Sequence, residues 1–187
     1  FLKKKKCLKL INVARLTEQK DHLTLLKALY LIKNKLDFRM LILGEGPYKN
    51  QLVNFINTHD LNKKVKIIDF KKNPFKFIKS SNIFVLTSKF EGLPNVLLEA
   101  ITLKKFIIST NCPTGPKEIL ANGKGGDLVK IGDYKSISRS IYAFSKNKKK
   151  INKKIINSYK SLIKFDMQEN LEKYFYIIFN YITNKDS

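Results

Sequence analysis

The chain has 187 residues, of which 43% are hydrophobic and 11% aromatic, enough to bury the core of one domain and too many for a disordered segment. Its net charge of +22 is carried by scattered lysines, since only Arg15, Arg39 and Arg139 are arginines. Proteins that read nucleic-acid bases favour the planar guanidinium group of arginine, so this composition argues against nucleic acid as a partner. An anionic membrane surface is the partner that the positive charge still suggests.

The expected location is the cytoplasm, with peripheral attachment to the inner face of the membrane as the alternative. No apolar run reaches the roughly 18 residues of a membrane span, and no signal peptide is recognisable. Cys7 and Cys112 lack a metal-ligand spacing, which fits a reduced setting. Because the chain opens with Phe1 rather than Met, residues 1–6 are interpreted as an interdomain linker or an artificial start.

Short apolar runs alternate with amphipathic stretches along the chain. Strands are predicted at residues 7–13, 38–43, 65–70, 83–87, 106–109 and 127–129. Helices are predicted at residues 21–34, 48–58, 75–79, 94–103, 116–121 and 134–144. The strands are continuously apolar, which indicates burial on both faces. This order predicts a Rossmann-like α/β domain over residues 7–146, a parallel sheet with helices on both faces.

Residues 147–187 are predicted to form a C-terminal helical tail. The tail begins with a segment dense in Lys and Asn, and Asp166 is the expected N-cap of its final helix. That helix would carry a stripe of large apolar residues that needs a surface to cover: Leu171, Tyr174, Phe175, Ile178 and Tyr181.

Two cations follow the first predicted strand. Arg15 and Lys20 precede the first helix, whose N-terminal N–H groups and partial positive charge favour an anion such as a diphosphate. The alternative is that both are solvated surface cations. Because ligands of open parallel sheets bind at the carboxyl ends of the strands, the position favours a binding role.

The sequence Gly-Glu-Gly-Pro follows the second predicted strand at residues 44–47. It is no dinucleotide fingerprint, because Lys49 stands where the third glycine would be, and it has no Walker lysine-serine pair. Gly44 and Gly46 therefore serve either a tight strand-to-helix turn or a close approach of the backbone to a ligand.

Residues 88–100 form the most informative candidate binding motif, at the end of a buried strand and the start of a helix. Pro94 suits the first helical turn, and Gly92 lets the backbone pass close to another group. Glu91 lies in the loop, and Glu99 lies among apolar residues, where a carboxylate needs a partner. Ligand hydroxyls would supply one. The alternative is a solvated Glu91 and a Glu99 paired with a lysine.

Glu91 and Glu99, with seven residues between them, resemble the E-x7-E motif of the retaining glycosyltransferase family 4 (group 1). Four further blocks are similar to those of that family, in its order: Asn-Val-Ala-Arg-Leu at residues 12–16, Lys-Asp-His at 20–22, Leu-Gly-Glu-Gly-Pro at 43–47 and Pro-Lys-Glu-Ile-Leu at 116–120. The resemblance covers residues 7–144. It implies the GT-B architecture, in which two Rossmann-like domains face each other across a cleft and the C-terminal one holds the nucleotide-sugar donor.

The resemblance also implies roles for residues of this chain. Arg15 and Lys20 would contact the donor diphosphate, Glu91 the hydroxyls of the transferred sugar and Glu99 the ribose. Arg15, Lys20 and Glu91 are the expected catalytic residues. The remaining expected donor-binding residues are Gly44, Gly46, Gly92, Leu93, Pro94, Asn95, Val96 and Glu99. The nucleotide base of the donor would lie near the segment after Ile67. The final helix would cross back onto the N-terminal domain.

This chain departs from the family at two positions. The family usually has a small glycine in the turn where this chain has Leu-Lys-Lys at residues 103–105, and it often has a glycine near Asp69. The second difference bears on the geometry of the site for the nucleotide base. Cys-Pro-Thr-Gly-Pro at 112–116 resembles a subgroup that uses UDP-N-acetylhexosamines or UDP-hexoses.

No cofactor or metal is expected, because no Asp-x-Asp motif occurs. Arg15, Lys20 and the helix that begins near Pro94 would then stabilise the departing diphosphate. The chain alone should transfer no sugar, since the N-terminal acceptor-binding domain is missing. The alternatives are a basic nucleic-acid-binding domain or another nucleotide-binding α/β domain, for which His22 and His59 would be the only histidine bases.

Overall fold

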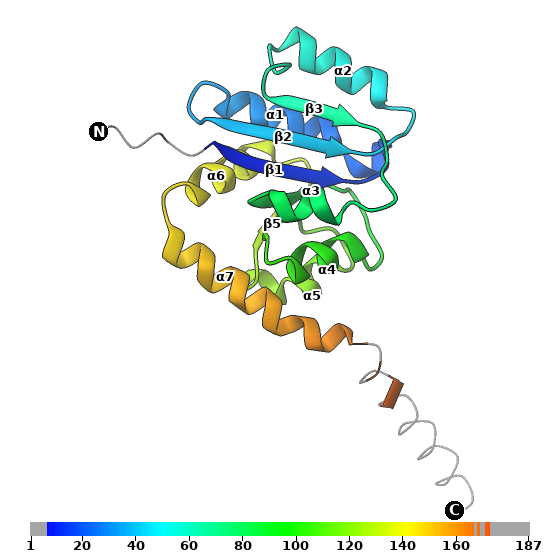
Figure 1. The fold of residues 1–187 in the computed structure, drawn as a ribbon, viewed down its shortest axis with the longest axis vertical. Coiled ribbons are helices and arrows are strands. Elements are labelled where there is room, and N and C mark those ends of the chain that lie inside the picture. The colour runs from blue at the N-terminus through cyan, green and yellow to red at the C-terminus, as the bar shows by residue number, and fades with distance from the viewer. Residues whose placement is uncertain (1–6, 167, 169–170, 173–187) are drawn as a thin grey trace, which may run out of the picture.

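The computed structural model describes residues 7–166, 168 and 171–172, and these residues form one six-stranded parallel sheet with helices on both faces (Figure 1). The order of the strands is β3-β2-β1-β4-β5-β6. The strands are β1 Leu8–Val13, β2 Phe38–Leu43, β3 Val65–Ile68, β4 Ile83–Leu86, β5 Phe106–Thr110 and β6 Asp127–Val129. The Rossmann-like α/β prediction is confirmed.

The central strands are buried on both faces, as their continuous apolarity predicted. Every residue of β4 and β5 is buried. The edge strand β3 ends at Ile68, two residues before the predicted end at residue 70. Its neighbour β2 ends opposite, at Leu43, and the N–H of Gly44 donates to the Ile68 carbonyl, so Asp69 and Phe70 have no strand to pair with.

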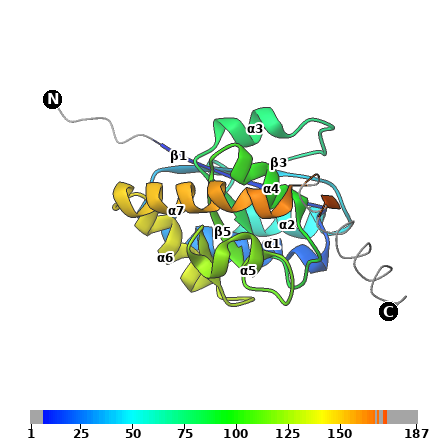
Figure 2. The ribbon, with the colours of Figure 1, turned by 90° about the horizontal axis from the view of Figure 1, so that it is seen from below.

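Two apolar clusters, one on each face of the sheet, hold the helices (Figure 2). The α-helices before the tail are α1 His22–Ile32, α2 Lys49–Thr58, α3 Phe75–Ser80, α4 Asn95–Thr102, α5 Pro116–Ile119 and α6 Tyr134–Phe144. Helices α1, α2 and α6 cover one face, and α3, α4 and α5 cover the other. Short 3-10 turns lie at Glu18–Lys20, Ala121–Gly123 and Leu162–Phe165.

The two central strands send their following helices to opposite faces. The chain after β1 enters α1 in one cluster, and the chain after the neighbouring β4 enters α4 in the other. Loops that part in this way open a crevice at the carboxyl ends of the strands, where open α/β sheets bind ligands.

The tail continues as helix α7, Lys148–Ser161, with the Asn147 side chain as its N-cap. Ile151 joins one apolar cluster, and Leu162 packs on the other, so α7 closes the side of the domain. The Asp166 carboxylate accepts the N–H of Gln168 at 2.9 Å, as expected of an N-cap. The rest of the predicted stripe, residues 174–181, lies outside the described residues. Among the described residues, no helix has the length and apolarity to cross a membrane.

Candidate functional site

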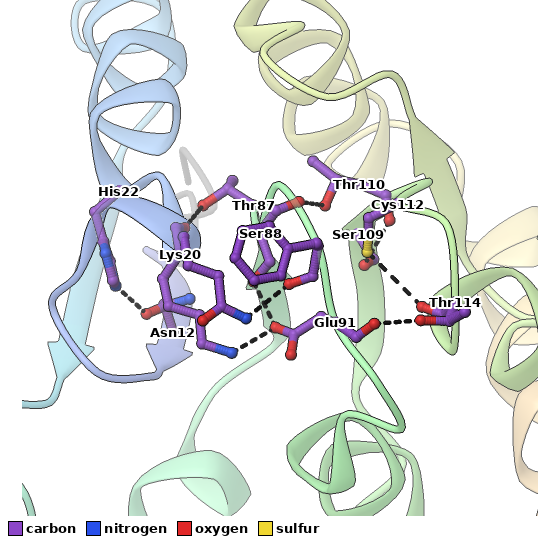
Figure 3. Close-up of polar contacts among 12 residues, drawn as sticks. Asn12, Lys20, His22, Thr87, Ser88, Glu91, Ser109, Thr110, Cys112 and Thr114 are labelled. Carbon is purple, nitrogen blue, oxygen red and sulfur yellow. Dashed lines mark hydrogen bonds and ion pairs between the residues drawn. The ribbon is translucent and has the colours of Figure 1, made fainter.

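Lys20 and Glu91 meet at the crevice between the β1 and β4 loops (Figure 3). The Lys20 Nζ lies 2.6 Å from Glu91 Oε1, and the Ser88 hydroxyl donates to the same oxygen at 2.6 Å. The two side chains are only 15% and 8% exposed. The structure therefore brings together two of the predicted catalytic residues, and it contradicts the alternative of a solvated Glu91.

Four further hydrogen bonds join the β1 and β4 loops, one of them from the Lys89 ammonium to a Glu18 carboxylate oxygen at 2.7 Å. The Thr87 hydroxyl donates to the Lys20 carbonyl at 2.9 Å, and the Lys89 N–H donates to the Gln19 carbonyl at 2.8 Å. The Gln19 side chain donates to the Phe90 carbonyl at 2.8 Å. Lys20 is thus positioned through its own backbone as well as through its ammonium group.

The loop after β5 supports the Glu91 segment from the other side. Thr110 donates to the Ser88 carbonyl at 2.6 Å, and Thr114 donates to the Glu91 carbonyl. Sequence reasoning gave no role to Thr87, Thr110 or Thr114. The signal was present, because Thr87 follows β4 and Thr110 ends β5, where a hydroxyl can bridge neighbouring loops.

Arg15 differs from Lys20 although both follow β1. Arg15 is exposed, and its guanidinium makes no hydrogen bond or ion pair with any residue that the structure describes. The charge of Lys20 is balanced by Glu91, so Arg15 is the cation of the pair that is available to an external anion.

Gly44 and Gly46 lie against the loop after β1. A Cβ at Gly44 would overlap the carbonyl oxygen of Ala14, and one at Gly46, whose φ is +153°, would overlap the backbone of Leu16. The Leu16 N–H also donates to the Glu45 carbonyl at 2.7 Å. The close approach that requires these glycines is therefore to a neighbouring loop of the chain itself.

The segment before α4 presents backbone to the crevice. Gly92 and Leu93 are exposed, Leu93 at 52%, and a Cβ at Gly92 would meet no atom within 4 Å. Pro94 is the N-cap, with φ −76° and ψ 89°, so the prediction that it lies in the first turn is wrong by one residue, because this ψ is not helical. Helix α4 starts at Asn95 and Val96 with no side-chain cap, which leaves its first N–H groups for an anion.

Glu99 lies in α4 and is partly buried. Burial raises the pKa of Glu99, and within the described part of the chain no lysine pairs with its carboxylate. The alternative that a lysine satisfies this carboxylate therefore finds no support there.

His22 opens α1 as a buried structural residue. Its Nε2 lies 2.9 Å from Asn12 Oδ1, and the Asn12 amide donates to the Val85 carbonyl at 2.8 Å, so we assign the proton to Nε2. Burial, and to a smaller extent the charge of Lys20, lower the pKa of His22 from 6.5 to about 4. His59 stacks on Phe55 at the end of α2, with ring centroids 3.9 Å apart.

A metal site is not formed by the described residues, which contain no group of three or more His, Cys, Asp or Glu side chains able to hold an ion. The cations and the free helix N-terminus are the electropositive groups of the crevice.

The family model described as "Glycosyl transferases group 1" matches residues 1–161. The chain belongs to this family. The membership decides against a basic nucleic-acid-binding domain. The crevice at β1 and β4 is thus the candidate site of a glycosyltransferase domain.

Two curated relatives illustrate the similarity. The chain is 46% identical over 111 residues to an uncharacterized glycosyltransferase of Methanocaldococcus jannaschii, covering 59% of this chain and 27% of that protein. It is 30% identical over 132 residues to N-acetylgalactosamine-N,N'-diacetylbacillosaminyl-diphospho-undecaprenol 4-alpha-N-acetylgalactosaminyltransferase of Campylobacter jejuni, covering 71% and 36%. The chain therefore spans between 27% and 36% of the length of these relatives.

Solved structures share the fold. The Anabaena protein HepE in complex with UDP superposes with a TM-score of 0.84 at 18% identity, covering 93% of this chain and 49% of that chain. The C-terminal domain of a glycosyl transferase group 1 family protein from Francisella tularensis superposes with a TM-score of 0.73 at 22% identity, covering 86% and 88%. The fold is that of one half of a GT-B glycosyltransferase.

Two glycines of the site should respond differently to a methyl group. Gly115 has a φ of +83°, and a Cβ there would overlap the Gly92 carbonyl oxygen, so Gly115→Ala should lower the free energy of unfolding by about 2 kcal/mol or more. Gly92→Ala is the matched control and should change it by less than about 0.5 kcal/mol. Urea denaturation followed by circular dichroism measures both. Equal losses in the free energy of unfolding would contradict the conclusion that Gly115 packs against backbone while Gly92 faces open space.

The buried neutral His22 should make stability depend on pH. Its folded pKa of about 4 lies below its ordinary value of 6.5, so as the pH falls through this window the unfolded chain takes up a proton that the folded chain refuses. Wild type should lose about 3 kcal/mol relative to His22→Gln between pH 6.5 and 4. Because carboxylates titrate alike in both proteins, the difference between their urea curves isolates His22. Parallel loss in the two proteins would show that His22 is not held neutral.

Proposed function

We propose that this chain is the donor-binding domain of a retaining glycosyltransferase that takes its sugar from a nucleotide diphosphate sugar. The observation that carries the proposal is the crevice between β1 and β4, where Lys20 and Glu91 pair and where the exposed Arg15 follows the same strand as Lys20. The uncapped start of α4 adds N–H donors to the same edge of the sheet. Cations and N–H groups suit a diphosphate, and carboxylates suit sugar hydroxyls.

Arg15, Lys20 and the N-terminus of α4 would stabilise the leaving group. As the bond between sugar and diphosphate breaks, negative charge develops on the departing nucleotide, and fixed positive groups lower that barrier. A hydrogen bond to a charged group contributes about 1.5–3 kcal/mol, so two cations could supply several decades of rate. The reaction proposed here needs no metal and no cofactor.

The two carboxylates would bind different hydroxyl groups of the donor. Glu91 stands beside Lys20, where the sugar would adjoin the diphosphate, and Glu99 lies within α4, with no lysine partner among the described residues. We assign Glu91 to the transferred sugar and Glu99 to the ribose. Gly92, Leu93 and the start of α4 would line the phosphates.

UDP is the proposed nucleotide, and a glycan or lipid-linked acceptor in surface polysaccharide synthesis is the proposed acceptor. The Anabaena neighbour contains UDP, and the name of the Campylobacter relative specifies a diphospho-undecaprenol acceptor. The acceptor would bind to an N-terminal domain that these residues do not include, so the chain alone should bind donor without transferring sugar. The enzyme would work in the cytoplasm or at the inner face of the membrane.

Replacing Arg15 tests whether a cation contacts the diphosphate. Arg15→Ala should weaken UDP binding by about 1–3 kcal/mol, the range for a hydrogen bond to a charged group. Lys146 is exposed at the end of α6, so Lys146→Ala is a control of equal charge and should cost almost nothing. Calorimetric titration with UDP-, GDP- and ADP-sugars provides the measurement and also selects the base.

Salt separates direct contact from diffuse attraction. Attraction between a positive surface and an anion is screened over about 8–10 Å near physiological ionic strength, whereas a direct contact is screened less. The difference between Arg15→Ala and Lys146→Ala should therefore persist at high salt. Convergence of the two variants would assign the nucleotide affinity to general surface charge and would refute the proposed site.

Replacing Glu91 should affect UDP and the UDP-sugar in opposite directions. In the free site Lys20 is held by Glu91, so Glu91→Gln should release Lys20 and tighten UDP binding by about threefold. The UDP-sugar should bind about tenfold more weakly relative to UDP, because a charged acceptor for its hydroxyls is lost. Glu99→Gln is the comparison and should weaken both ligands. If Glu91→Gln weakens the binding of UDP and of the UDP-sugar equally, then Glu91 does not bind the transferred sugar separately from the rest of the donor.

A further inference from the structure

Helix α7 has an inner face that belongs to the domain. Ile151 and Ser158 are buried, and a Cβ at Gly125 would crowd the Ser158 side chain. Lys154 also turns inward, where its ammonium lies 2.5 Å from an Asp127 carboxylate oxygen and donates to the Gly126 carbonyl at 2.9 Å. These contacts fix the rotation of the helix about its axis.

One flank of α7, between its inner face and its outward lysines, is apolar and exposed. Ile156 is 53% exposed, Tyr159 is 44% exposed, and Ile163, just beyond the helix, is 57% exposed. Ile156 and Ile163 are seven residues apart, which is two helical turns, so they share one side. We name Ile156, Tyr159 and Ile163 the outer stripe. Figures 1 and 2 show α7 along the outside of the domain, and the Lys104 ammonium lies 4.9 Å from the centroid of the Tyr159 ring at the edge of the stripe.

Lysines flank the outer stripe, and no acidic residue balances them within the helix. The sequence of α7 contains no Asp or Glu. Lys149, Lys150, Lys153 and Lys160 are exposed, and none of them pairs with a described acidic residue. An apolar stripe with lysines at its margins can insert its apolar side chains while the lysine ammonium groups stay at the polar surface.

We propose that the outer stripe and its flanking lysines form a docking surface for an anionic lipid bilayer, with α7 lying in the plane of the interface. A second copy of the chain fits poorly, because two such faces would bring their lysines together. A bilayer of anionic lipid supplies both the apolar interior and the negative charge that this face requires. The inference does not depend on the proposed donor site.

A single tryptophan placed in the stripe tests insertion, because the full chain contains none. In Ile156→Trp, the emission should shift to shorter wavelength when vesicles of phosphatidylcholine and phosphatidylglycerol are added, and it should not shift with phosphatidylcholine alone. Val53→Trp, at an equally helical but distant exposed position on α2, is the control and should show no shift. Absence of a shift at position 156 would overturn the proposal.

Sedimentation with the same vesicles separates the stripe from the general charge of the chain. Ile156→Ser with Ile163→Ser should weaken binding about tenfold, and the matched pair Leu31→Ser with Val53→Ser should not. Lys149→Gln, Lys153→Gln and Lys160→Gln together should weaken it by about tenfold or more, and binding should fall as salt rises. The charge control is Lys27→Gln, Lys63→Gln and Lys66→Gln.

Two results would overturn the proposal even if the wild type binds vesicles. Equal weakening by the control sets would mean that binding follows net charge rather than α7. Self-association that is lost in the Ile156→Ser, Ile163→Ser protein would assign the stripe to a second copy. Circular dichroism of each variant establishes that the domain remains folded, so a loss of binding reports the surface.

Discussion

The ion pair between Lys20 and Glu91 joins two loops that the topology of the sheet sends to opposite faces. The chain leaves β1 towards α1 and leaves β4 towards α4, and this parting creates the crevice. Without contacts across it, the crevice would have no defined shape. The pair, the Thr87 bond to the Lys20 carbonyl and the Gln19 bond to Phe90 supply those contacts.

The pair also sets the charge of the free site. A largely buried ion pair gains little net stability, because the cost of removing both charges from water offsets much of their attraction. The pair is therefore better explained by the ligand groups that could replace each partner. On the proposed function, the diphosphate would replace Glu91 at Lys20, and sugar hydroxyls would replace Lys20 at Glu91, so neither charge would be left buried alone.

The glycines around the crevice serve two different purposes. Gly44, Gly46 and Gly115 are required because another segment of backbone lies where a side chain would be. Gly92 faces open space, and no described residue lies where its side chain would be. Close packing therefore holds the loops of the crevice, while Gly92, which has room around it, lies where the proposed donor would pass.

The sequence by itself determined the strands, the helices, the positions of Arg15, Lys20 and Glu91 in loops after strands and that of Glu99 in a helix, because apolar periodicity and turn residues act locally. It could not determine that Lys20 and Glu91 pair, since they are 71 residues apart and meet only when β1 and β4 become neighbours. Nor could the sequence decide whether Gly44 serves a tight turn or the close approach of a ligand, because the group that lies against Gly44 belongs to the loop after β1. The end of β3 and the outward direction of Ile156 were likewise decided by neighbours: β2 stops pairing at Leu43, and the inner contacts of α7 set its rotation. Local pattern specifies which elements form, and long-range packing specifies which side chains remain for a ligand or a surface.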